Sequence, residues 1–128
     1  MKSVNYPAKI ERIFRASEHN FRAAAFHQKC DNKTDTLTLL VTHFGKTIGG
    51  YSHYEWKSDG SYVNNSGRRV CIFSLDMMEK FVPQGDEKLI YRRKDYGPTF
   101  GGGNDIRIYD GCKDNNSSNA NFPTTFNR

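Results

Sequence analysis

The side chains of this chain that could carry out chemistry form a small set: His19, His27, His43, His53, Cys30, Cys71, Cys112 and Glu55. His27 and Cys30 are three residues apart, so on a helix they share one face, and together with Cys112 they could hold zinc. A structural zinc site requires four ligands, and no second cysteine or histidine pair has such a spacing. We therefore expect Cys30 to be a small buried hydrophobe and His27 its exposed neighbour.

Two further patterns could indicate catalysis or phosphate binding, but neither carries a mechanism. A cysteine–histidine nucleophile pair needs a third group to orient its base, and spacing does not establish one. His53 and Glu55 would share one strand face, which cross-strand surface pairing explains equally well. The stretch 96–109, YGPTFGGGNDIRIY, opens a strand, whereas a phosphate loop opens a helix and carries Gly-Lys-Ser/Thr. We predict no catalytic, cofactor-binding or metal-binding residues.

The glycine-rich stretch is better interpreted as a shaped loop that leads into a strand. Gly97 and Pro98 should interrupt the chain, because proline fixes φ whereas glycine permits almost any value. Phe100 stands among the glycines at 101–103 as a large apolar anchor, which predicts that the loop is attached to the core. Ile106 and Ile108 alternate with polar residues, as in a half-buried strand.

Earlier in the chain, the sequence predicts a helix followed by a β-hairpin. Three consecutive alanines favour a helix over residues 23–30. Alternating Leu37, Leu39 and Val41 predict a strand at 36–41 with one apolar face. A second strand at 47–56 should pair with it across Gly45 through residues 48–54. Gly49 and Gly50 leave bare backbone on both faces of that strand, and we expect the helix or the Phe100 loop to fill the gap.

The remaining segments complete the expected fold. Residues 70–75 are almost continuously apolar and predict a strand buried on both faces, ended by the segment 81–85, with a further strand at 89–91. Short strands and frequent turns predict an α+β, mainly β fold, a two-sheet antiparallel β-sandwich with one or two flanking helices. Residues 1–12 are a lead-in, and 13–128 form a single domain. The expected core residues are Phe26, Leu39, Ile72, Phe73, Phe100 and Ile106.

The order of these segments resembles that of the TLDc domain family, in its short, protist-like form, over about residues 13–122. The residues that carry the resemblance have structural roles in the expected motif: Phe21, Phe26, Cys30, Gly49, Gly50, Gly97, Pro98, Phe100, Gly101, Gly102, Asp105 and Cys112. The resemblance also favours a strand over a helix at 12–15. It implies a non-catalytic module of a family linked to oxidative-stress resistance and, in several members, to regulation of the vacuolar-type proton ATPase.

The chain departs from the family pattern at its end. TLDc domains continue into a last strand of alternating apolar and acidic residues, and no such segment precedes Arg128. We expect an open sheet edge, to which a protein partner could add a strand. The alternative is that the Asn- and Ser-rich tail folds back over that edge, anchored by Phe122 and Phe126.

Composition excludes several other classes of protein. The net charge of +5 is spread along the chain, and the basic runs at 67–69 and 91–94 are too short for a nucleic-acid arm. No segment has the roughly 20 apolar residues of a membrane span. An odd number of cysteines and no signal peptide predict an intracellular, cytoplasmic protein. The leading hypothesis is a protein-interaction domain. The alternatives are a structural subunit of a large intracellular assembly and, third, a thiol-dependent antioxidant enzyme.

Overall fold

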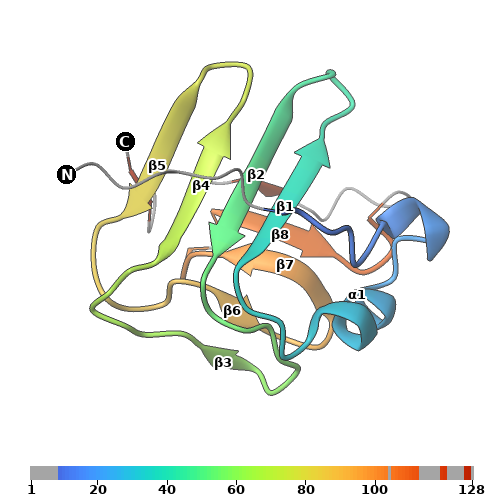
Figure 1. Ribbon diagram of the computed structural model, residues 1–128, viewed down its shortest axis with the longest axis horizontal. Coiled ribbons are helices and arrows are strands. Elements are labelled where there is room, and N and C mark those ends of the chain that lie inside the picture. Colours follow the sequence, from blue (N-terminus) through green and yellow to red (C-terminus); the bar gives the residue numbers. More distant parts are fainter. Residues whose placement is uncertain (1–8, 104, 113–118, 121–125, 128) are drawn as a thin grey trace.

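Two layers of antiparallel sheet make up the body of the protein in the computed structural model, which describes residues 9–103, 105–112, 119–120 and 126–127. A five-stranded sheet of order β1-β2-β4-β5-β10 lies over a three-stranded sheet of order β7-β8-β9, with β3-β6 as a small ribbon at one end (Figure 1). The predicted α+β, mainly β sandwich is therefore confirmed. The elements are η1 (Ala16–Glu18), α1 (Ala23–Cys30), β1 (Thr36–Val41), β2 (Thr47–Ser52), β3 (Ser61–Tyr62), β4 (Val70–Ser74), β5 (Glu79–Pro83), β6 (Tyr91–Arg92), β7 (Tyr96–Phe100), β8 (Ile106–Tyr109), β9 (Asn119–Ala120) and β10 (Phe126–Asn127).

The predicted helix and hairpin are both confirmed. The helix occupies the expected residues, and β1 pairs with β2 from Thr36 opposite Ser52 to Val41 opposite Thr47. The turn between the strands closes with Gly45 N donating to Thr42 O at 2.9 Å, and Gly45 has φ +79°. A glycine adopts this left-handed conformation without steric cost, and it fits the twist of a three-residue hairpin loop.

Several predicted strand boundaries are wrong. The second strand of the hairpin ends at Ser52, and the segment 81–85, expected to end the strand before it, begins with the last three residues of β5. Leu89 and Ile90 are fully buried but precede β6, although Ile90 forms an isolated bridge with Phe100. Residues 12–15, expected as a strand, form neither strand nor helix. Element ends depend on tertiary partners, which local patterns do not encode.

The core lies between the two sheets and is rich in aromatic side chains. Phe26 of α1 contacts Phe14 and Trp56 edge-on, with centroids 5.8 and 5.5 Å away, and Trp56 contacts Phe100 at 5.6 Å. Edge-to-face pairs are a favoured geometry for aromatic rings. The predicted core residues Phe26, Ile72, Phe100 and Ile106 are each at most 4% exposed. Trp56 belongs to the same cluster.

Two predicted core residues lie elsewhere. Leu39 is 58% exposed, and Phe73 is only half-buried. Burial alternates along β4, where Val70, Ile72 and Ser74 are buried and the residues between them are not, so the strand is not buried on both faces. We call the side of the five-stranded sheet that carries Ile72 the inner face and the side that carries Leu39 the outer face.

The C-terminal region corrects the expectation that no last strand closes the sheet. Phe126–Asn127 pairs antiparallel with β5, and Phe126 is fully buried in the core. The alternative, a tail folded back onto this edge with Phe126 as an anchor, is therefore confirmed for that residue. The second proposed anchor, Phe122, lies outside the described residues, as do residues 1–8 of the expected lead-in.

Candidate functional site

His27 is a buried structural residue rather than the exposed neighbour of Cys30 that we expected. Its Nε2–H donates to the carbonyls of Arg93 and Tyr96 at 2.9 and 2.8 Å, and its Nδ1 forms a 2.6 Å hydrogen bond with the carboxyl group of Asp31. The second carboxylate oxygen of Asp31 accepts from Ser58 at 2.6 Å. Both ring nitrogens are therefore engaged, and this histidine fastens α1 to the turn before β7 instead of offering a lone pair to a metal.

The cysteines lie in surroundings that disfavour the reactive thiolate. Burial, and then the nearby charge of Asp31, raise the pKa of Cys30 to about 11. Burial also raises the pKa of Cys71 above its ordinary value. Because the thiolate is the nucleophile and the metal ligand, both thiols are poorly suited to either role near neutral pH. Cys30 and Cys71 form no disulfide.

His53 and Glu55, which we expected on one strand face with cross-strand partners, take part in two separate interactions. His53 Nδ1 donates to Asp35 at 2.8 Å, and Tyr51 Oη donates to the same carboxylate oxygen at 2.6 Å. These two hydrogen bonds, that of Tyr51 first, hold the pKa of Asp35 below its ordinary value. Glu55 forms an ion pair with Lys57 at 3.2 Å. Sequence reasoning missed the Asp35 cluster, although the hairpin register, extended by one residue, brings positions 35 and 53 together.

An aspartate that orients a histidine is also the arrangement of a general base, so the free nitrogen of His53 decides what this cluster can do. Arg69 NH1 lies 3.3 Å from Nε2, and since a guanidinium can only donate, Nε2 accepts this hydrogen bond. The base position is thus already occupied. The hydroxyl that shares Asp35 belongs to Tyr51, and a hydrogen bond to that carboxylate is the leading cause that raises the pKa of Tyr51.

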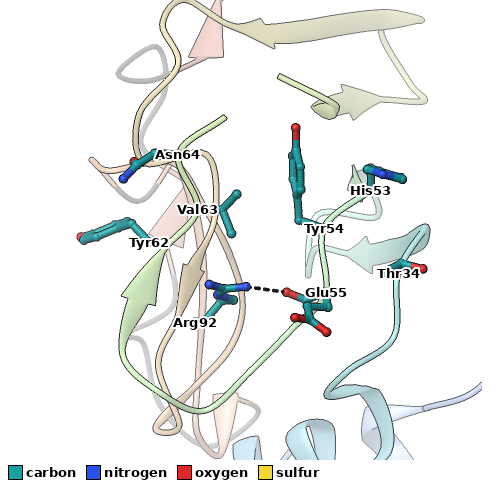
Figure 2. A pocket seen from close by; sticks show the side chains of 8 residues that line it. All are labelled: Thr34, His53, Tyr54, Glu55, Tyr62, Val63, Asn64 and Arg92. Atoms are coloured by element: carbon teal, nitrogen blue, oxygen red, sulfur yellow. Dashed lines mark hydrogen bonds between the residues drawn. The ribbon is translucent and has the colours of Figure 1, made fainter. Parts of the chain in front are cut away.

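A shallow groove of about 470 Å³ lies beside this cluster, between the chain after β2 and the β3-β6 ribbon. Its lining residues are Thr34, His53, Tyr54, Glu55, Tyr62, Val63, Asn64 and Arg92. Figure 2 shows Arg92 reaching toward Glu55, whose carbonyl accepts from Arg92 NH1 at 3.3 Å, whereas the rings of Tyr62 and His53 point away from the groove. Arg92 Nε also donates to Ser61 at 2.9 Å. Arg92 is therefore used to join two segments of the protein. The groove offers few other polar groups that would orient a substrate.

The two adjacent glycines of β2 are covered by aromatic rings from opposite sides. A side chain at Gly50 would collide with the ring of Phe100 on the inner face, and one at Gly49 would collide with the ring of Phe73 on the outer face. The expectation that the Phe100 loop fills the glycine gap is confirmed, since Phe100 is 1% exposed. The contact of Gly50 with Phe100 thus holds the two layers together, whereas that of Gly49 with Phe73 lies within the five-stranded sheet.

The other glycines of the motif lie in and after β7. Gly97 and Pro98, which we expected to interrupt the chain, instead lie inside β7, where the register with β8 shifts between Tyr96 and Thr99. Such an irregularity accommodates the missing N–H of proline. A side chain at Gly102 would meet Lys88 at 2.7 Å, and Gly101 adopts φ +88°.

The polar positions of the motif tie distant segments together. Asp105 is fully buried, and its carboxylate accepts from the backbone N–H of Phe126 at 3.2 Å, which secures β10. Phe21 accepts a backbone hydrogen bond from Gly111, next to Cys112. Asp110 accepts from Ala23 N at 2.8 Å and so caps the start of α1. Sequence reasoning overlooked this last residue, because the cap comes from another part of the chain.

The outer face of the five-stranded sheet is unusually apolar for a surface. Leu37, Leu39 and Val41 of β1 are 47%, 58% and 74% exposed, and Leu75 at the end of β4 is 50% exposed. The tips of the two neighbouring hairpins continue this surface with Phe44, Met77 and Met78, of which Met78 is 85% exposed. Thr47 N donates to Asp76 at 2.6 Å and so holds the tips together. Exposed apolar side chains gathered on one face of a sheet are a common feature of interaction sites.

Within the described residues, no three His, Cys, Asp or Glu side chains lie where they could share a metal ion. No helix among those residues is long and apolar enough to cross a membrane.

Comparison with known proteins gives one result. A sequence model of the TLDc domain matches residues 2–128, essentially the whole chain. No curated protein and no solved structure matches it significantly.

Proposed function

Because the chain belongs to the TLDc domain family, we propose that it is a non-catalytic protein-interaction domain that docks a partner on the outer face of its five-stranded sheet. The single observation that carries this proposal is the exposure of the apolar side chains on that face and at its two hairpin tips. In a core strand such as β4, apolar residues on one face are normally covered. An apolar surface left open in the free chain is typical of a docking site.

The family's association with the vacuolar-type proton ATPase extends this proposal to a partner, the cytosolic sector of that pump, and to a role in resistance to oxidative stress. The free thiols of Cys30 and Cys71 support an intracellular location, since such thiols persist in a reducing compartment. Lys80 lies opposite Phe73 in the strand register and adds a cation to the outer face. The docked partner surface should therefore be apolar with at least one acidic group.

The engagement of the reactive groups supports a non-catalytic role. Both nitrogens of His27 and both nitrogens of His53 bond to protein groups. Cys30, with its pKa near 11, is a poor nucleophile at neutral pH, which argues against a thiol-dependent antioxidant enzyme.

A second candidate is a structural subunit of a large intracellular assembly. The observation that favours it is the edge of β1, which no other described strand pairs with. A regulator binds its partner reversibly, whereas a structural subunit remains in the assembly through purification. The two functions therefore differ in how readily the bound chain exchanges with free chain. Labelled chain added to the native assembly should replace the bound chain only if the chain is a regulator.

The decisive experiment measures binding of the purified chain to the isolated cytosolic sector of the vacuolar-type ATPase. Leu75→Lys and Met78→Lys place a charge on the outer face, and both should weaken binding at least tenfold. Ile10→Lys is the matched control, because Ile10 is 76% exposed and lies outside the sheet. Absence of binding by the parent chain would refute the pump as the partner. Equal binding by the parent and both outer-face variants would refute the docking face.

A further inference from the structure

β1 forms one edge of the five-stranded sheet, and its backbone groups divide into two sets (Figure 1). Thr42 N donates to Lys46 O at 2.9 Å, so this is a hydrogen-bonded pair of the hairpin. Hydrogen-bonded pairs alternate along an antiparallel ladder, which places Thr38 and Leu40 in the same class. The N–H and C=O groups of Leu37, Leu39 and Val41 must therefore point away from β2.

The next strand provides an independent check of this assignment. Leu75 N donates to Thr47 O at 3.0 Å, so the backbone of Thr47 is directed toward β4. Thr47 is the partner of Val41 in the register, and Val41 consequently has its backbone groups on the open side. No other described strand pairs with that side of β1.

The edge also lacks the features by which proteins protect open strands. Its sequence, TLTLLV, contains no charge and no proline, and its register with β2 runs without a bulge over all six residues. The outward-pointing residues are the same three whose aliphatic side chains are exposed on the outer face. A long, regular and apolar edge of this kind is a template for another strand.

We propose that the occupant of this edge is a second copy of the chain, paired antiparallel through β1 about a two-fold axis at Leu39. The two five-stranded sheets would then join into one continuous sheet. Leu39 would lie opposite Leu39 of the second copy, and Leu37 opposite Val41.

Three constraints select this arrangement. Residues directly opposite each other have their side chains on the same face of the sheet. The outer faces of the two copies therefore lie on one side only when the residues whose backbone groups point to the open edge pair with each other. Centring the pair on Leu39 matches all three outward residues of each strand, so every outward N–H meets an outward C=O. Within this register only uncharged residues, those at 37–41, lie opposite one another, so no like charges meet at the two-fold interface.

This pairing goes beyond the proposed function and does not depend on it. It joins two copies of the chain through the edge of β1, whereas the proposed function docks a different protein on the outer face. It would also extend the docking surface, since Leu37, Leu39 and Val41 of both copies become neighbours on one outer face.

The test exploits the fact that residue 39 would face itself. The parent chain should form a concentration-dependent dimer, followed by its mass in analytical ultracentrifugation. Leu39→Lys and Leu39→Glu should each be monomeric over the same range, because each places like charges directly opposite one another. An equimolar mixture of the two variants should recover a dimer, and native mass spectrometry should identify it as the heterodimer. Both substitutions are at an exposed position, so the monomer should remain folded.

Leu75→Lys is the matched control, since it charges the same sheet face away from the edge and should leave the dimer intact. A parent chain that is monomeric at every concentration would overturn the proposal. So would dimers of Leu39→Lys that persist, and a mixture that stays monomeric would overturn the register. Loss of pump binding with an intact dimer, or the reverse, would separate this proposal from the proposed function.

Discussion

Buried polar side chains of this protein connect segments that lie far apart in the chain. His27 and Asp105 are both buried, and each spans two distant segments with its hydrogen bonds. Buried polar groups that are fully bonded stabilise a unique arrangement, because losing one partner leaves the other unsatisfied. Cys30, the last residue of α1, is buried in the hydrophobic core.

Cys30 should make the stability of the domain fall at alkaline pH. Burial raises the pKa of this thiol to about 11 from its ordinary value of 9.0, which we assign to the unfolded chain. Between these two values the unfolded thiol has lost its proton while the folded thiol keeps it. Unfolding then releases a proton, and stability declines as pH rises from 9 toward 11. Urea unfolding of the parent and of Cys30→Ala across this window should show a steeper decline in the parent. Equal slopes would contradict a buried, neutral thiol.

Phe100 should be essential for stability although it borders a glycine-rich loop. Phe100→Ala removes a ring that is 1% exposed and contacts Trp56, and it should cost about 3–5 kcal/mol of unfolding free energy. Phe44→Ala removes the same atoms from a position that is 78% exposed, and its cost should stay within about 0.5 kcal/mol. Denaturant titrations of both variants provide the comparison. Similar midpoints would mean that the loop is not anchored to the core.

At the scale of single elements, β2 combines close packing on both faces with a regular ladder. Its two glycines let one aromatic ring approach the backbone from each side, a contact that no residue with a side chain allows. β1, its neighbour, has a partner along one edge only among the described strands. The backbone of β2 is therefore paired along both edges, whereas that of β1 is paired with a described strand along only one.

Gly50→Ala should test the inner contact of β2. The new methyl group would collide with the ring of Phe100, and displacing a buried ring should cost about 1–3 kcal/mol. Gly85→Ala is the matched control, because a methyl group there would meet nothing within 4 Å, and its effect should stay below about 1 kcal/mol. Thermal unfolding of both proteins would decide the matter. A neutral Gly50→Ala would show that the two layers are loosely packed.

Hydrogen exchange should alternate along β1 in the dilute chain. The amides of Thr38 and Leu40 bond to β2 and should exchange slowly, whereas those of Leu37, Leu39 and Val41 point to the open edge and should exchange rapidly. Amide-resolved NMR can measure both sets in one sample. Uniform protection in a chain shown to be monomeric would mean that another part of the chain covers the edge.

For the molecule as a whole, the five-stranded sheet has one covered face and one exposed face. Its inner face packs on the aromatic core, and its outer face leaves aliphatic side chains exposed. Substitutions on the outer face should therefore change association more than folding.

The folded domain should be independent of bound metal. Both ring nitrogens of His27 are hydrogen-bonded to protein groups, and the raised pKa of Cys30 keeps its thiol neutral near pH 7. A chelator should therefore leave the melting temperature of the purified chain unchanged. Elemental analysis should find no stoichiometric zinc. Zinc that disappears in Cys30→Ala or His27→Ala would contradict this prediction.

Local sequence patterns were enough to predict the helix and the hairpin. Three alanines and the alternation on either side of Gly45 were sufficient for α1 and for the β1-β2 hairpin, because helix propensity and strand period are properties of neighbouring residues. The blocks around the glycine-rich stretch were also sufficient for the family.

The tertiary structure alone decided which face of each element is buried. Alternation shows that the two sides of β1 differ, but the inner side holds Thr36, whose hydroxyl accepts from Trp56 Nε1 at 2.9 Å, while Leu39 faces outward. His27 is likewise buried because the turn at Arg93 and Tyr96, far away in the chain, supplies its acceptors. Burial is set by the partner that packs on a face, and that partner comes from long-range contacts that no local pattern encodes.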